Sequence, residues 1–175
     1  MRSRRLAFLL CPSVVFQVWF INALSGCAPY SFTGSSVPPH LKTIAIPLFD
    51  DQSGFGEAGL REDFTNRLIG RFTRDNTLEV ADKTGADSIL EGVILSVRDE
   101  PAVVEKGETV NKRRVTIGVK ATFHDMKLRK KVWEKQLSNW GDYQIGAGPA
   151  ERKVAITAAI EKLTEDILLE TVSGW

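Results

Sequence analysis

The clearest structural signal in the sequence is the nonapeptide VTIGVKATF, which occupies residues 115–123. Its apolar positions are Val115, Ile117, Val119, Ala121 and Phe123. Strict alternation of this kind is typical of a β-strand with one face in the core and the other in water. We therefore expect a sheet of which one face is covered by other elements.

Shorter patterns predict the rest of this sheet. Residues 42–48, 93–97 and 131–140 each direct apolar side chains to one side, and a short strand is expected around residues 78–80. In the second of these segments the alternating side chains are Val93, Leu95 and Val97. The three later strands follow one another in sequence. They therefore predict an antiparallel meander whose two connecting loops lie at opposite ends of the sheet.

Two amphipathic helices complete the predicted elements. Over about residues 57–74, Leu60, Phe64, Leu68 and Phe72 recur every four residues, which is one apolar stripe of a helix. A second helix begins at Gly148-Pro149, and its stripe is Ile156, Ile160, Leu163 and Ile167. The order strand, helix, strands, helix predicts an α+β two-layer sandwich. In it, two helices pack on one face of a mostly antiparallel four-stranded sheet.

The two loops of the predicted meander differ in charge. The first carries the acidic residues Asp99, Glu100, Glu105 and Glu108 against Lys106. The second carries the basic residues Lys127, Arg129, Lys130 and Lys131 against Asp125. We therefore expect a domain that is nearly neutral as a whole but polarised along its strands.

The basic loop has two interpretations. Lysines at a hairpin tip can simply solvate the turn and protect the sheet edge from association. Alternatively, Lys127, Arg129, Lys130 and Lys131 form a site for phosphate or carboxylate groups, since clustered cations near a membrane attract anionic head groups at about 1 kcal/mol each. Arg113 and Arg114 lie toward the other end of the neighbouring strand and are not expected to share this site.

The N-terminus has the organisation of a secretory signal. Three arginines within residues 2–5 precede an apolar run over residues 6–21, and small residues then lead to Leu24-Ser25-Gly26-Cys27. A cysteine placed after Leu-Ser-Gly in this way resembles the bacterial lipobox. The resemblance implies cleavage before Cys27 and a fatty-acid lipid (palmitate) on its thiol. The expected organisation is a signal peptide over 1–26, a lipidated tether over 27–40 and one α/β domain over 41–175.

Other outcomes stay open for this segment. It can remain uncleaved as an anchor, or be cleaved as an ordinary signal at Ala23 or Ala28 with Cys27 left free. If Cys27 is lipidated, Ala28 in place of Asp favours sorting to the outer membrane, with the domain on its periplasmic face.

Composition excludes several classes of protein. Removal of residues 1–26 takes three arginines away and leaves 149 residues with 20 basic and 22 acidic side chains. A nucleic-acid partner is not expected, because such proteins show a dominant basic footprint. Lipidation of Cys27 would leave no thiol for a disulfide, a zinc site or catalysis, because Cys11 leaves with the signal. No cofactor is expected beyond the covalent lipid.

Motifs that carry catalytic chemistry are weak here. Residues 54–59 spell G-x-G-x-x-G, and Glu79 follows about twenty residues later, as a dinucleotide-binding fingerprint requires. The carboxylates of Asp50 and Asp51 just before it would repel a pyrophosphate, so we interpret the glycines as a flexible turn. His40 and His124 have no Cys, His or Asp at ligand spacing and are expected to be loop residues. We therefore expect no enzyme and no metal site.

Aromatic residues near the C-terminal half form one further candidate. We expect Trp133, Trp140 and Tyr143 to form a cluster that serves the core or contacts a partner.

Taken in order, several segments resemble one family. Cys27 is followed by Tyr30-Ser31-Phe32-Thr33-Gly34, then Val37-Pro38-Pro39 and the strand Lys42-Thr43-Ile44-Ala45-Ile46-Pro47. Later come Leu137-Ser138-Asn139-Trp140-Gly141-Asp142-Tyr143 and a C-terminal helix ending on Trp175. This sequence resembles the LptE family of lipopolysaccharide-assembly lipoproteins over essentially the whole mature chain.

The resemblance implies a non-enzymatic outer-membrane lipoprotein. Such proteins associate with the LptD β-barrel, sit partly inside it as a plug, assist its assembly and contact lipopolysaccharide. Lys127, Arg129, Lys130 and Lys131 are candidates for that contact from charge alone. Exchange of Lys127 and Lys130 for Glu is expected to weaken lipopolysaccharide binding without unfolding the domain.

A second resemblance points to another role. Residues 44–48, the helix that follows and Ala86-Asp87-Ser88-Ile89-Leu90-Glu91-Gly92 are similar to the α/β domains of curli-secretion and synthase-activator lipoproteins. The alternative function is therefore that of a lipoprotein adaptor or activator of a different envelope machine.

Overall fold

The computed structural model describes residues 37–102, 112–146, 148–173 and 175, and this part of the chain folds as one compact unit. The signal peptide, Cys27 and the tether up to residue 36 lie outside the described residues. Glu105, Lys106 and Glu108 of the acidic loop also lie outside them. The predictions made for these residues therefore stay predictions.

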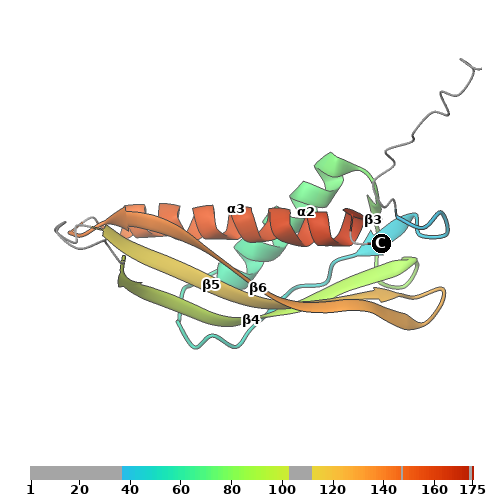
Figure 1. The fold of residues 1–175 in the computed structure, drawn as a ribbon, viewed down its shortest axis with the longest axis horizontal. Helices are drawn as coiled ribbons and strands as arrows, with labels where there is room; N and C mark the ends of the chain where they lie inside the picture. The colour runs from blue at the N-terminus through green and yellow to red at the C-terminus, as the bar shows by residue number, and fades with distance from the viewer. Residues whose placement is uncertain (1–36, 103–111, 147, 174) are drawn as a thin grey trace, which may run out of the picture. The chain divides into compact units, whose positions relative to one another are not determined.

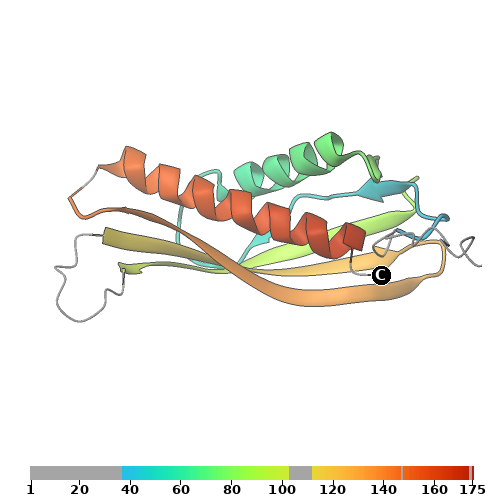
Figure 2. The ribbon, with the colours of Figure 1, turned by 45° about the horizontal axis from the view of Figure 1, so that its top comes forward.

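Two helices and six strands make up the described fold (Figure 1). In chain order they are β1 (Thr43–Ala45), β2 (Asp50–Asp51), α2 (Leu60–Asp75), β3 (Glu79–Val80), β4 (Ser88–Pro101), β5 (Lys112–Asp125), β6 (Lys130–Gln144) and α3 (Pro149–Ser173). The strands lie side by side in the order β3-β1-β4-β5-β6, and β2 pairs with β4. Both helices cover the same face of this sheet (Figure 2). The α+β class and the placement of the helices are therefore as predicted.

The prediction of a mostly antiparallel four-stranded sheet is wrong in detail. β4, β5 and β6 do form an antiparallel meander, but β1 is parallel to both β3 and β4, and β2 is also parallel to β4. Helix α2 is the cause, because it carries the chain back along the sheet between β1 and β3. The two-residue strand β2 was not predicted, because Asp50 and Asp51 carry no apolar alternation.

Strand β5 behaves as its sequence predicts. All five apolar positions from Val115 to Phe123 are buried, and the intervening side chains face outward. The alternation continues two residues further, so Asp125 also lies on the covered face and is fully buried.

Strand β4 differs from its predicted pattern. Its pairing with β5 shifts by one residue between Ile94 and Ser96, which is a β-bulge. A bulge moves the alternation to the opposite phase. Ile94 and Val97 are therefore buried, whereas Leu95 is exposed, and the predicted alternation of Val93, Leu95 and Val97 on one face is wrong.

The core lies between the sheet and the two helices. Its largest fully buried side chains include Phe49, Phe64, Phe72 and Phe123, together with Ile44, Leu68, Ile117, Ile160 and Leu163. All four predicted stripe residues of α2 and all four of α3 are buried. Thr65 ties α2 to the strand side, since its hydroxyl donates to Arg61 O and accepts from Phe49 N at 2.8 and 3.0 Å.

Two glycines allow this packing to be close. A Cβ atom on Gly141 of β6 would lie 2.1 Å from the backbone oxygen of Ala155 in α3. A Cβ atom on Gly92 of β4 would lie 2.1 Å from the ring of Phe49. Both positions therefore need a residue without a side chain.

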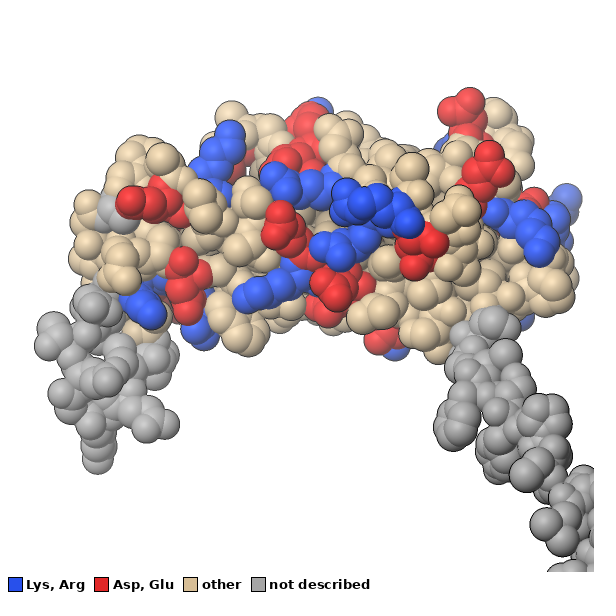
Figure 3. Space-filling model, turned by 90° about the horizontal axis from the view of Figure 1, so that it is seen from above, with Lys and Arg blue, Asp and Glu red and all other residues tan. Residues whose placement is uncertain are grey.

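The helices also contact each other through charged side chains. Arg67 lies 3.2 Å from Glu161, and Arg71 bonds to Thr164, Glu165 and the carbonyl of Glu161. Positive and negative side chains are interleaved over this face of the molecule (Figure 3). The helical layer therefore presents no extended surface of one charge.

Candidate functional site

The β5–β6 hairpin ends in a turn that gathers the predicted basic residues. We call residues 126–131 the basic tip. Buried Asp125 organises this turn, because its carboxylate accepts the backbone N–H of Leu128 at 2.8 Å. Arg129 has a φ of 52°, in the left-handed region, where the chain reverses into β6.

His40 is the second partner of Asp125. Its Nε2 lies 2.7 Å from Asp125 Oδ2, although 85 residues separate the two in sequence. His40 does lie in a turn, as predicted, but it is not isolated, because it pairs with Asp125. His124, also predicted to be a loop residue, lies instead in strand β5. Burial raises the pKa of Asp125, but the bonds from Leu128 and His40 outweigh burial and hold that pKa below its usual range.

Lys127 also binds the segment that contains His40, residues 37–40, which we call the N-terminal segment. Its Nζ donates to the carbonyl of His40 at 2.7 Å and lies 3.0 Å from Asp87 Oδ1. Asp87 in turn accepts the backbone N–H groups of Lys42 and Thr43. The N–H of Lys42, with Lys127, lowers the pKa of Asp87 despite some desolvation. Exchange of Lys127 for Glu would place two carboxylates together here, so we no longer expect that variant to leave folding untouched.

The four candidate cations therefore differ in availability. Lys131 pairs with Glu134 at 3.3 Å, and Lys127 is engaged as described. Arg129 and Lys130 form no ion pair within the described part of the chain. Met126 and Leu128 lie beside them with exposed fractions of 44% and 57%. The sequence reasoning missed these two residues, although their alternation with the cations was visible in it.

The opposite end of the meander carries a different cluster. Asp99 accepts Arg113 Nε at 2.8 Å and the hydroxyl of Tyr143 at 2.7 Å, and Arg152 of α3 lies 3.2 Å away. Desolvation raises the pKa of Asp99, but these donors outweigh it, and the pKa is lowered. Arg113 and Arg114 thus belong to the far end, as predicted.

The predicted aromatic cluster does not exist as one unit. Trp133 packs on Phe123, which also contacts Trp175. Trp140 lies on the outer face of β6 under Arg114 and Lys162, at 4.8 and 5.2 Å from the ring centroid. Tyr143 belongs to the Asp99 cluster. Burial isolates the indole N–H of Trp133, which has no hydrogen-bond partner among the described residues.

The G-x-G-x-x-G motif has a conformational role. Gly54, Gly56 and Gly59 have φ values of 67°, 73° and 78°, and a Cβ atom on any of them would meet open space. The glycines are therefore needed for their left-handed backbone in the turn that enters α2. Arg152 covers the neighbouring Phe55 ring at 4.8 Å and pairs with Glu57.

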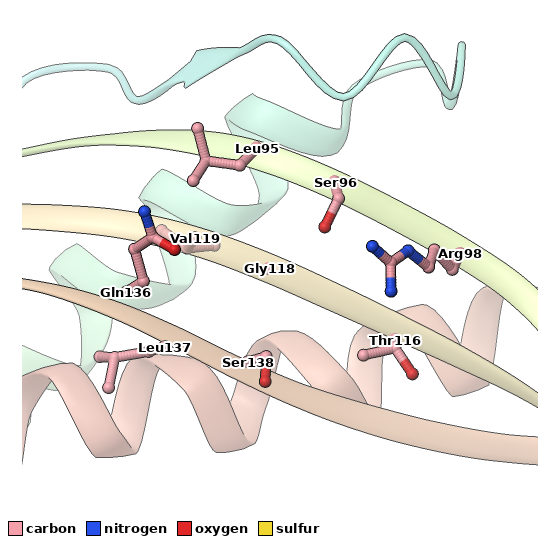
Figure 4. A pocket seen from close by; sticks show the side chains of 9 residues that line it. All are labelled: Leu95, Ser96, Arg98, Thr116, Gly118, Val119, Gln136, Leu137 and Ser138. Atoms are coloured by element: carbon pink, nitrogen blue, oxygen red, sulfur yellow. The ribbon is translucent and has the colours of Figure 1, made fainter.

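The uncovered face of the sheet is hollowed where Gly118 has no side chain (Figure 4). This hollow of about 360 Å³ is lined by Leu95, Ser96, Arg98, Thr116, Gly118, Val119, Gln136, Leu137 and Ser138. No acid, histidine or cysteine is among these nine lining residues, so the hollow holds no acid–base pair. The hollow presents hydroxyl groups, one side-chain amide and one guanidinium, which could bind the polar surface of a partner.

The described ranges carry neither a membrane-spanning helix nor an assembled metal-ligand set. Neither α2 nor α3 is long and apolar enough to cross a bilayer. Within the same ranges, no three His, Cys, Asp or Glu side chains lie together as a metal site would require.

Solved structures from several bacteria share this fold. A hypothetical protein from Chlamydia trachomatis matches with a TM-score of 0.56 at 9% identity, over 74% of this chain and 95% of its own. The PelC dodecamer from Paraburkholderia phytofirmans matches with 0.50 at 14%, over 81% and 95%. A minor lipoprotein from Acinetobacter baumannii matches with 0.50 at 14%, over 78% and 94%. At such identities the likeness concerns the fold alone, and no curated protein matches the sequence.

These features define a class first, a two-layer α+β domain with a long antiparallel hairpin and helices on one face only. The sequence then defines the family. The chain belongs to the LptE family, described as lipopolysaccharide-assembly, whose model matches residues 41–171. The match spans every element from β1 to α3 except the last two residues of α3, and it confirms the predicted family.

Proposed function

We propose that this chain is a lipid-anchored protein of the outer membrane's periplasmic face. In this role it partners an LptD-type β-barrel as plug and assembly factor for transport and insertion of lipopolysaccharide. The observation that carries the proposal is the family match over residues 41–171. We propose no catalytic role, since the family's work is assembly.

The surface of the domain is compatible with a barrel lumen. Such interiors are polar, and the uncovered sheet face presents Ser96, Thr116, Gln136 and Ser138 around the hollow. A lipid on Cys27 would keep the domain beside the barrel and raise its effective concentration there. Both arguments support a plug without specifying its contacts.

Purification in mild detergent tests the partner. A large β-barrel that co-purifies in stoichiometric amount supports the proposal. A homo-oligomeric ring, or a synthase as the main partner, would instead support the alternative role in another envelope machine. The alternative is worth testing because the PelC structure, which shares the fold, is a dodecamer.

The lipid anchor has its own test. The mass of the purified mature chain should show cleavage before Cys27 and added acyl groups, and the protein should fractionate with outer membranes. A Cys27→Ser variant should lose the acyl mass and leave the membrane fraction. Recovery of unmodified Cys27 in a soluble mature chain would contradict lipidation.

The basic tip is the proposed contact for lipopolysaccharide phosphates. Because Lys127 and Lys131 are engaged within the domain, Arg129 and Lys130 are expected to carry most of that contact. Arg129→Glu with Lys130→Glu should weaken binding at least tenfold, because opposite charge repels phosphate. Arg74→Glu with Lys153→Glu, on the exposed helical layer, is the matched control. If both double variants lose lipopolysaccharide binding equally, the basic tip is not the contact site.

A further inference from the structure

We propose that the basic tip docks on the phospholipid surface of the leaflet that holds the chain's own lipid anchor. This inference goes beyond the proposed function and uses from it only the lipid on Cys27. It requires neither the barrel nor lipopolysaccharide, whose phosphates would compete for the same residues when present.

The composition of the tip fits a bilayer surface. Met126 and Leu128 expose 44% and 57% of their surface, and Arg129 and Lys130 follow directly in the chain. Apolar side chains beside cations are what the boundary between head groups and acyl chains accommodates. Burial of Leu128 in that boundary would remove an exposed apolar side chain from water.

The basic tip has more cations than the neighbouring acids neutralise. The acids near the tip are already paired: Asp125 with His40, Asp87 with Lys127, and Glu134 with Lys131 and Lys120. Neither Arg129 nor Lys130 is paired within the described residues. Each would therefore attract an anionic phospholipid surface by about 1 kcal/mol.

The position of the tip relative to the anchor is the third argument. His40 and Lys127 bind the tip to the N-terminal segment, and Figures 1 and 2 show the two at the same end of the domain. Val37 is the tenth residue after Cys27, so the anchor lies at most about 36 Å from the start of the described chain. The far end of β5, at Lys112, lies about 45 Å along the strand from the tip. The tether from Cys27 therefore joins the domain at the end that carries the tip, which brings the tip within reach of the leaflet, whereas the far end lies about 45 Å further along the strand.

A single-thiol probe tests this docking. Lipidation consumes Cys27, so Leu128→Cys gives the mature lipidated protein one thiol for a fluorophore. Val154→Cys, which is 66% exposed on α3 near the far end, is the matched control. The proteins are reconstituted into vesicles of phosphatidylcholine with or without phosphatidylglycerol, which carry a lipid-borne quencher.

We expect at least threefold stronger quenching at position 128 than at 154 in the vesicles that contain phosphatidylglycerol. Arg129→Glu with Lys130→Glu should abolish the difference. Equal quenching at the two positions would overturn the proposal, and so would a difference that appears only when lipopolysaccharide is added. If mass measurement shows no lipid, the anchor fails separately. In that case Cys11→Ser and Cys27→Ser leave the probe cysteine as the single thiol. The unlipidated protein is then added to the same vesicles, and the quenching at positions 128 and 154 still decides whether the tip docks.

Discussion

At the scale of single residues, Asp125 joins segments that lie far apart in the sequence. It continues the inward phase of β5 and brings a carboxylate into the covered layer, where water does not reach it. It is stable there because His40 and the N–H of Leu128 replace water as hydrogen-bond partners. One side chain thereby connects the hairpin turn to the N-terminal segment that contains His40.

Asp125→Asn should lower the free energy of unfolding by about 1–3 kcal/mol at pH 7, since charge-assisted bonds to a buried carboxylate are lost. The pKa of Asp125 is lowered in the folded state, so its stabilisation is present above the unfolded pKa and disappears as the pH falls through the folded value. Urea unfolding at pH 7 and pH 3 should show the difference from the parent shrinking in acid. Exposed Glu100→Gln is the control, and a pH-independent difference would contradict this account.

Gly141 makes a second prediction at this scale. A methyl group there would lie 2.1 Å from the Ala155 carbonyl, and backbone cannot swing aside as a side chain can. Gly141→Ala should therefore destabilise the domain by about 3 kcal/mol, measured by thermal or urea unfolding. In Gly118→Ala the new methyl meets mainly the mobile hydroxyl of Ser96, so a small change is expected. Equal effects would show that α3 can move away from β6.

At the scale of elements, the sheet and the helices differ in how they are held. The long strands β4, β5 and β6 are fixed by their ladders and by one buried face. Helices α2 and α3 are fixed to the sheet by apolar stripes and to each other by polar contacts of Arg67 and Arg71. The contact between the two helices should therefore weaken when one of these polar side chains is removed.

Arg71→Ala tests this contact between the helices. Arg71 is only 24% exposed on its side chain and bonds to three groups of α3, so its loss should cost about 1 kcal/mol. Among the described residues Arg61 forms an ion pair only with its neighbour Glu62, at the surface, so Arg61→Ala should change stability by less than about 0.5 kcal/mol. Urea unfolding of both variants measures the contrast. Equal values would mean that the α2–α3 bonds add nothing beyond a surface ion pair.

At the scale of the whole described domain, its two ends have distinct chemistry. One end holds the basic tip and the N-terminal segment, joined through Asp125, Asp87 and Lys127. The other end holds Asp99 with Arg113, Tyr143 and Arg152. The predicted basic end is therefore present, but at the other end Asp99 is paired with Arg113 and Arg152, and Glu105 and Glu108 lie outside the described residues. The acidic character of that end stays a prediction.

Deletion of residues 37–40 tests whether the N-terminal segment stabilises only its own end. The deletion removes His40 and the partly buried Val37, so the Leu128 amide, held by Asp125, should exchange hydrogen at least tenfold faster. Amides of Val115 and Ile117 near the far end should keep their exchange rates. Faster exchange throughout would show that the segment stabilises the whole fold, and unchanged exchange at Leu128 would refute its role at the tip.

The sequence by itself determined the α+β class, the covered face of β5, both helical stripes and the gathering of Lys127, Arg129, Lys130 and Lys131 in one turn. Each of these follows from local periodicity or chain connectivity, which a sequence displays directly. Tertiary structure alone decided the parallel pairing of β1, the bulge in β4 and the bond between His40 and Asp125. These depend on contacts between distant segments, and His40 and Asp125 are 85 residues apart. For the same reason, only the fold could show that Lys127 is engaged with His40 and Asp87, whereas Arg129 and Lys130 form no ion pair among the described residues.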